Sequence, residues 1–159
     1  MNNLSEITAI LALIGSLLVA GIFFAFSSFI MKALARLPSS EGIAAMQSIN
    51  IVVINPTFLT VFIGTTAISL MLVIISIWAW GVPASPYFLI GGLLYVVGTF
   101  LVTGMGNVPL NNQLAEMNAN DPRASDIWQL YLVKWTWLNT IRTICTAVAA
   151  MVILVGLLI

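Results

Sequence analysis

The sequence contains no histidine and only one cysteine, Cys145. Histidine and cysteine supply most protein ligands of zinc, haem and iron–sulfur clusters, so no metal site of these kinds is expected. A single cysteine cannot form an intramolecular disulfide. Because Cys145 stands among apolar residues, we interpret it as a packing residue rather than a reactive thiol. We therefore expect neither a metal nor any other cofactor.

Charged residues are also scarce. They make up 6% of the 159 residues and hydrophobic residues 61%, whereas a typical soluble domain carries about 25% charged residues. So little polar material cannot cover a water-facing surface, which favours an integral membrane protein over an unusually apolar soluble one. The net charge of zero makes nucleic acid an unlikely partner and leaves the lipid bilayer as the expected one.

Four apolar segments are long enough to cross a bilayer as helices, which takes about 20 residues. They run approximately over 7–31, 56–80, 87–105 and 136–159. The first is interpreted as a retained span, because no basic residue precedes it and it exceeds the roughly 7–15 residues of a signal-peptide core. We expect an all-α fold, a four-helix transmembrane bundle that forms a single domain over 1–159.

Turn-forming residues separate these segments. Asn55 and Pro56 are suited to start the second helix, and 81–86 predicts a short turn. Gly106-Asn107-Val108-Pro109 is expected to end the third helix. The last helix has no Gly or Pro between Asp126 and Gly156 and is therefore expected to be long. Residues 39–53 predict a short additional helix that either lies on the membrane or caps the bundle.

The basic residues indicate an orientation. Lys32 and Arg36 follow the first span, and Arg123 and Lys134 follow the third. With four spans both connections lie on one side, which the positive-inside rule makes cytoplasmic. Both termini are then predicted outside, in a multi-pass protein of the plasma or inner membrane.

Polar residues gather at the predicted cytoplasmic end. Candidate site residues there are Ser27, Asn50, Asn107, Asn111, Trp135, Asn139 and Arg142. Asparagine and proline are ordinary loop formers, so the segment from Asn107 to Asn111 is either a plain turn or the wall of a polar pocket.

Arg142 is the most informative of these residues. Only 17 mostly apolar residues follow it, so it lies at or below the headgroup boundary. Trp135, Asn139 and Arg142 are spaced by four and three residues and share one helix face. Three interpretations are open. The arginine snorkels to lipid phosphate, joins a purely structural buried network, or points inward and binds an anionic or enolate-like group.

Several motifs resemble those of the DUF1772 family of small membrane proteins, which includes the anthrone oxygenases. Their markers are Gly21-Ile22-Phe23-Phe24-Ala25-Phe26-Ser27, Met46-Gln47-Ser48-Ile49-Asn50, Asn55-Pro56, Gly106-Asn107-Val108-Pro109-Leu110-Asn111 and Trp135-x-x-x-Asn139-x-x-Arg142-Thr143. Together they cover nearly the full length in the same order.

The resemblance implies a four-span protein and, for the oxygenases, cofactor-independent oxidation of an anthrone to an anthraquinone. Arg142 and Asn139 would then be catalytic and stabilise an enolate-type anion, with Asn107, Asn111, Trp135, Asn50 and Ser27 binding the ligand. The family often has histidine directly after the asparagine of its last motif. This chain has Thr140 there, which cannot act as a base at neutral pH.

Two functions follow as hypotheses. In the first, a polar pocket at the cytoplasmic end binds a lipophilic phenol, quinone or anthrone and acts as an oxygenase on it. In the alternative, the chain is a non-catalytic membrane module that binds lipid or a partner protein. The alternative predicts that Arg142 faces lipid or a subunit contact and that no cavity exists. The sequence does not specify the natural ligand or the oligomeric state.

Overall fold

The computed structural model describes residues 3–118 and 121–159, and its secondary structure there is helical without strands. The prediction of an all-α bundle is confirmed. The predicted single domain over 1–159 includes residues 1–2 and 119–120, which lie outside the described residues. The elements are α1 (Asn3–Ala25), η1 (Phe26–Ile30), α2 (Met31–Leu34), α3 (Ser39–Val52), α4 (Pro56–Trp78), α5 (Ser85–Tyr95), η2 (Val96–Leu101), η3 (Thr103–Asn107), α6 (Val108–Ala115) and α7 (Ala124–Leu158), where η denotes a π-helical segment.

Four continuous helical stretches are long and apolar enough to cross a membrane. They are Asn3–Leu34, Pro56–Trp78, Ser85–Ala115 and Ala124–Leu158. The protein is therefore a multi-pass membrane protein, as predicted. The third and fourth stretches extend well beyond the predicted spans of 87–105 and 136–159, because α6 and the first part of α7 continue the helices into more polar sequence.

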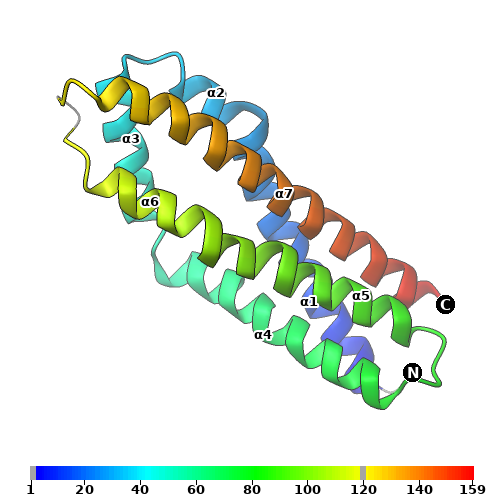
Figure 1. Ribbon diagram of the computed structural model, residues 1–159. Helices are drawn as coiled ribbons and strands as arrows, with labels where there is room; N and C mark the ends of the chain where they lie inside the picture. Colours follow the sequence, from blue (N-terminus) through cyan, green and yellow to red (C-terminus); the bar gives the residue numbers. More distant parts are fainter. Residues whose placement is uncertain (1–2, 119–120) are drawn as a thin grey trace.

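The four spans form a closed ring. α1 packs against α4 and α7, and α5 packs against the same two helices. Both chain ends lie at one end of this elongated bundle, whereas α2, α3, α6 and the start of α7 lie at the other end (Figure 1). We call the latter the α3 end.

Two glycines of α5 allow this helix to pack closely against α4 and α7. A Cβ placed on Gly91 would lie 2.5 Å from Cγ1 of Ile153 and 3.1 Å from the carbonyl oxygen of Ala149, both on α7. On Gly92 it would lie 2.8 Å from the carbonyl oxygen of Ser69 on α4. Helices in lipid associate largely through such close backbone packing, so these two glycines fix α5 between α4 and α7.

The starts of α4 and α7 differ in how well the sequence predicts them. Asn55 caps α4 as expected, since the Phe58 N–H donates to its Oδ1 at 3.0 Å and Pro56 occupies the first turn. The last apolar span is predicted from about 136, and the long last helix is confirmed: α7 begins at Ala124, well before that span.

The expectation that Gly106-Asn107-Val108-Pro109 ends the third helix is wrong. The helix continues through η3 into α6 and ends at Ala115. The Val108 N–H bonds to the carbonyl of Thr103, an i to i+5 bond of the π type. Pro109 follows in the first turn of α6. Since proline lacks an N–H, it is tolerated at such a junction between two helical hydrogen-bond patterns.

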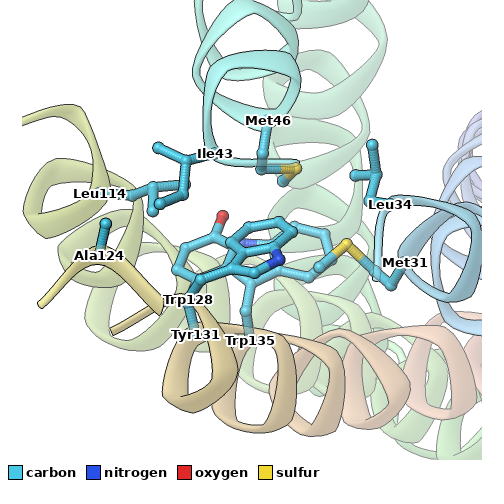
Figure 2. Close-up of a cluster of buried hydrophobic side chains, with 9 residues drawn as sticks. All are labelled: Met31, Leu34, Ile43, Met46, Leu114, Ala124, Trp128, Tyr131 and Trp135. Atoms are coloured by element: carbon cyan, nitrogen blue, oxygen red, sulfur yellow. The ribbon is translucent and has the colours of Figure 1, made fainter. Parts of the chain in front are cut away.

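α3 covers the α3 end of the bundle. Its Ile43 and Met46 are buried against Trp128, Tyr131 and Trp135 of α7. Figure 2 shows these aromatic side chains rising from α7 toward α3, with Leu114 and Met31 at the sides. The predicted helix over 39–53 therefore exists and caps the bundle.

Candidate functional site

A cavity of about 350 Å³ lies toward the α3 end, between all four spans and α3. Its walls are mostly apolar, with Phe23, Phe62, Phe100 and Trp135 among the largest lining side chains. The volume falls at the lower end of the range of about 300–1,000 Å³ that is usual for small-molecule pockets. The cavity arises because α4 packs along α5 and η2, whereas η3 and α6 pack against α7 and α3 instead.

Arg142 brings a buried positive charge to the wall of this cavity. The residue is only 4% exposed. Nη1 donates to Thr103 Oγ1 at 3.0 Å, and Nη2 donates to Asn139 Oδ1 at 2.6 Å. Its Cζ lies 4.1 Å from the ring centroid of Phe23 and 5.4 Å from that of Trp135. The side chain therefore points inward, and it does not snorkel to the bilayer surface.

No carboxylate balances this charge within the described part of the chain. The one ion pair there joins Arg123 and Asp121 on the exposed connection before α7, 3.3 Å apart. The backbone N–H and the guanidinium of Arg123 hold the pKa of the Asp121 carboxyl below its usual range. Nε of Arg142 is buried and has no hydrogen-bond partner among the described residues.

Asn139 and Ser27 stand behind Arg142 rather than on the cavity wall. Asn139 is fully buried and donates through Nδ2 to the Phe23 carbonyl and to Ser27 Oγ, each at 2.7 Å. These bonds fix the amide so that its oxygen faces the arginine. The two residues connect α7 to the end of the first span and position the guanidinium.

Asn107 and Asn111 line the cavity from the third span. Asn107 is 1% exposed and donates from Nδ2 to the Trp135 carbonyl at 3.2 Å. This bond identifies the free end of the amide as Oδ1, which is buried without a partner. Asn111 Oδ1 accepts from Tyr131 at 2.9 Å and from Trp135 Nε1 at 2.7 Å. The asparagine segment is thus a helical wall and not a plain turn.

A stack of aromatic rings runs along α7 from Arg142 toward the α3 end. The ring centroids of Trp135 and Tyr131 are 6.1 Å apart, and those of Tyr131 and Trp128 are 5.7 Å apart. Asn50 of α3 also lines the cavity, with an Nδ2 that is buried and unpartnered. Its side chain lies close to the Tyr131 hydroxyl.

Of the predicted site residues, five line the cavity and two support it. Asn50, Asn107, Asn111, Trp135 and Arg142 line it, and Ser27 and Asn139 lie behind. Sequence reasoning missed Thr103 and Phe23, which contact Arg142 directly beside the predicted Asn139 and Trp135. Thr103 lies four residues before Asn107, a spacing that could have identified it.

Thr140 is turned away from the arginine. Its hydroxyl donates to the Thr136 carbonyl at 2.8 Å, and its oxygen lies 3.1 Å from Ser27 Oγ, within hydrogen-bond distance. The residue is not part of the cavity lining. Thr140 does not contact the cavity itself. It contacts Ser27, which in turn bonds to Asn139.

The cavity opens sideways between α4 and the third span. Six of its lining residues are also exposed on the outer surface: Ile54, Ile63, Phe100, Gly104 and Val108 beside this gap, and Ile22 on α1. A Cβ on Gly104 would meet no atom within 4 Å. Ile63 lies in the apolar stretch Pro56–Trp78, so an opening at this height would face lipid once the bundle is in a bilayer.

Fold and site together define a multi-pass membrane protein with a buried cation beside an apolar cavity. The anthrone oxygenase family model matches residues 55–152, from the cap of α4 through most of α7. The chain belongs to this family, which confirms the resemblance seen in the sequence. No curated protein and no solved structure matches the chain. The described residues contain no group of three or more His, Cys, Asp or Glu side chains that could hold a metal ion.

Proposed function

We propose that the cavity binds a flat, lipophilic phenol, quinone or anthrone and stabilises its anion at Arg142, and that the chain oxidises such an anthrone without a cofactor. One observation carries this proposal. A buried guanidinium with no carboxylate partner in the described chain lines an apolar cavity. A ligand anion would supply the missing negative charge.

The energetics favour an anionic ligand over an empty site. Taking a charge out of water costs several kcal/mol unless it is paired and hydrogen-bonded. Two neutral acceptors and two aromatic rings offset only part of that cost for Arg142. In such a low-dielectric site an oxyanion is stabilised far more than in water, and the guanidinium is already in place.

The walls suit a flat ring system. Phe23, Phe62 and Trp135 surround the cavity, and the rings of Phe62 and Phe100 lie 5.9 Å apart. Aromatic rings favour offset or edge-to-face contact with another ring system at such spacings. The ligand would therefore hold its ring plane among these side chains and its oxygen against Arg142.

The oxidation balances with molecular oxygen alone. Loss of one proton from the ring methylene of an anthrone gives an enolate, whose oxygen Arg142 stabilises. The enolate carbon forms a bond to O₂, which takes up the carbon's electrons, and the product after protonation is a hydroperoxide. Loss of water from the hydroperoxide leaves the ketone of an anthraquinone. One oxygen atom enters the product and the other leaves as water.

No histidine or carboxylate lines the cavity. The first step, the loss of a proton from the ligand, therefore depends on the acidity of the ligand itself. A cation beside the enolate oxygen lowers the pKa of the bound ligand, because it stabilises the charged form. A water molecule inside the cavity would accept the proton. Thr140 has no part in this step.

Oxygen consumption with anthrone tests the proposal. Purified protein in lipid nanodiscs is expected to consume one O₂ per anthraquinone formed. Arg142→Met should lower kcat/KM by about 100-fold or more, the usual effect of losing an oxyanion donor. Lys134→Met is the matched control, since Lys134 is an exposed cation on the same helix.

Binding measurements separate the alternatives. If the wild-type protein binds anthrone but takes up no oxygen, the result contradicts the oxygenase and supports a non-catalytic binding module. Absence of both binding and uptake in the wild-type protein would overturn the proposed function.

A further inference from the structure

α3 contributes a wall of the cavity although it lies outside the segment that the family model matches. That segment begins at residue 55, and α3 ends at Val52. Met46, Ile49 and Asn50 line the cavity from α3. Asn50 is the only polar residue among them, so this wall offers a ligand one hydrogen-bonding group.

Two contacts hold α3 in place. Nε2 of Gln47 donates to the carbonyls of Leu114 and Met117, at 2.8 and 3.0 Å, at the end of the third span. On another face, Gly42 packs so closely on Trp128 that a Cβ there would lie 2.8 Å from the indole ring. The position of Asn50 is therefore fixed by its helix.

The amide of Asn50 has an unused donor. Its Nδ2 is buried and makes no hydrogen bond within the described residues. The nearby Tyr131 hydroxyl donates to Asn111, and its oxygen, which could accept from Asn50, makes only a long contact with the Asn50 amide and no hydrogen bond of ordinary geometry with Nδ2. Buried amide groups are nearly always hydrogen-bonded, so an unused one that lines a cavity indicates a ligand acceptor.

Asn50 and Arg142 lie at separate places on the cavity wall. Arg142 lies over the Trp135 ring, and Tyr131, the neighbour of Asn50, is the next ring along the stack. A fused ring system that carries an oxygen at each end could place one oxygen at Arg142 and the other at Asn50.

Building on the proposed function, we infer that Asn50 is a specificity-determining residue that recognises a second oxygen of the ligand. The ligand class is a fused aromatic with an ionisable oxygen at one end, held by Arg142, and a hydroxyl or carbonyl oxygen at the other end, held by Asn50. α3 would then select among lipophilic phenols by their oxygen pattern.

Two matched probes test this inference, 2-hydroxyanthracene and 2,6-dihydroxyanthracene, which differ by one oxygen at the far end. Binding is measured by probe fluorescence anisotropy in nanodiscs, with empty nanodiscs correcting for partition into lipid. The wild-type protein is expected to bind the dihydroxy probe about tenfold more tightly, the usual order for one hydrogen bond in a buried site. Asn50→Leu should abolish that preference, and the readout is the ratio of the affinities of one variant for the two probes. Asn112→Leu, the same change at an exposed position, should keep the preference.

The results of this experiment distinguish a failure of the role inferred for Asn50 from a failure of the proposed function. Equal affinity of the wild-type protein for both probes, or a preference that survives in Asn50→Leu, overturns the role of Asn50 and leaves the proposed function standing. Failure of the wild-type protein to bind either probe overturns the proposed function itself. Asn50→Asp, which keeps the shape but replaces the donor by an acceptor, should also lose the preference and serves if the leucine variant unfolds.

Discussion

Arg142 carries a charge that the apolar cavity cannot solvate, and any enol bound beside it becomes a stronger acid. Oxygen uptake requires the enolate, so the rate should rise with pH through the pKa of the bound ligand. In the wild-type protein this pKa is lowered by the guanidinium. Activity is therefore present at lower pH than in a variant without the charge.

The pH profile checks this residue directly. We expect the midpoint of residual uptake in Arg142→Met to lie at least about one pH unit above that of the wild-type protein, which corresponds to about 1.4 kcal/mol. The profile of Lys134→Met should coincide with the wild-type profile. An unchanged midpoint in Arg142→Met would mean that Arg142 does not act on the ionisation of the ligand.

At the scale of residues, the sequence predicted which side chains share one face of α7. It did not predict which side chains of the other helices contact that face. Trp135 and Arg142 line one cavity because helix periodicity places them on one face. The division into lining and supporting residues was not predictable, since it depends on which neighbour each side chain meets. The resemblance implies a catalytic role for Asn139, and its bonds to Phe23 and Ser27 hold its side chain behind Arg142, off the cavity wall.

Among the elements, α5 depends most on close packing. Gly91→Ala should lower the free energy of unfolding by about 1–3 kcal/mol, because the new Cβ meets Ile153 and a backbone carbonyl of α7. Thermal unfolding in detergent measures this. Gly64→Ala in α4 is the matched control, since a Cβ there meets no atom within 4 Å. Equal stability of the two variants would show that α5 and α7 separate at little cost.

Helix limits were predictable where capping is local and not where the hydrogen-bond pattern changes. Asn55 caps α4 through its own side chain, which the sequence indicates. The third helix runs past Pro109 only because η3 shifts the pattern to i to i+5 bonds. A π-helical segment depends on packing around it and leaves no clear signal in the sequence.

For the whole molecule, the sequence predicts the side of the membrane on which each end lies. α2, α3 and the start of α7 lie together at one end of the bundle, opposite both chain ends (Figure 1). Lys32, Arg36, Arg123 and Lys134 belong to those elements or their connections. The positive-inside rule then predicts that the α3 end is cytoplasmic.

Fusions to the C-terminus test this orientation. Alkaline phosphatase fused there should be active, because it folds outside the cytoplasm, and green fluorescent protein fused there should stay dark. The reverse pattern would contradict the predicted topology. A reporter inserted in the 81–86 turn is the matched control, since that turn lies at the same end as both termini and should report the same side.

The number of spans was predictable from the sequence because bilayer thickness sets their length. The cavity was not, because it depends on how far α4 and the third span separate at the α3 end. That separation arises from the combined packing of α3, α6 and α7, which no single motif encodes.

The sideways opening between α4 and the third span makes the bilayer the reservoir for the site. A fused aromatic partitions strongly from water into lipid, and O₂ is also more soluble in hydrocarbon than in water. Both reactants of the proposed reaction would therefore arrive at local concentrations above those in the surrounding solution. An apparent KM expressed per volume of water would then vary with the amount of lipid present, whereas one expressed per mole of lipid would remain constant.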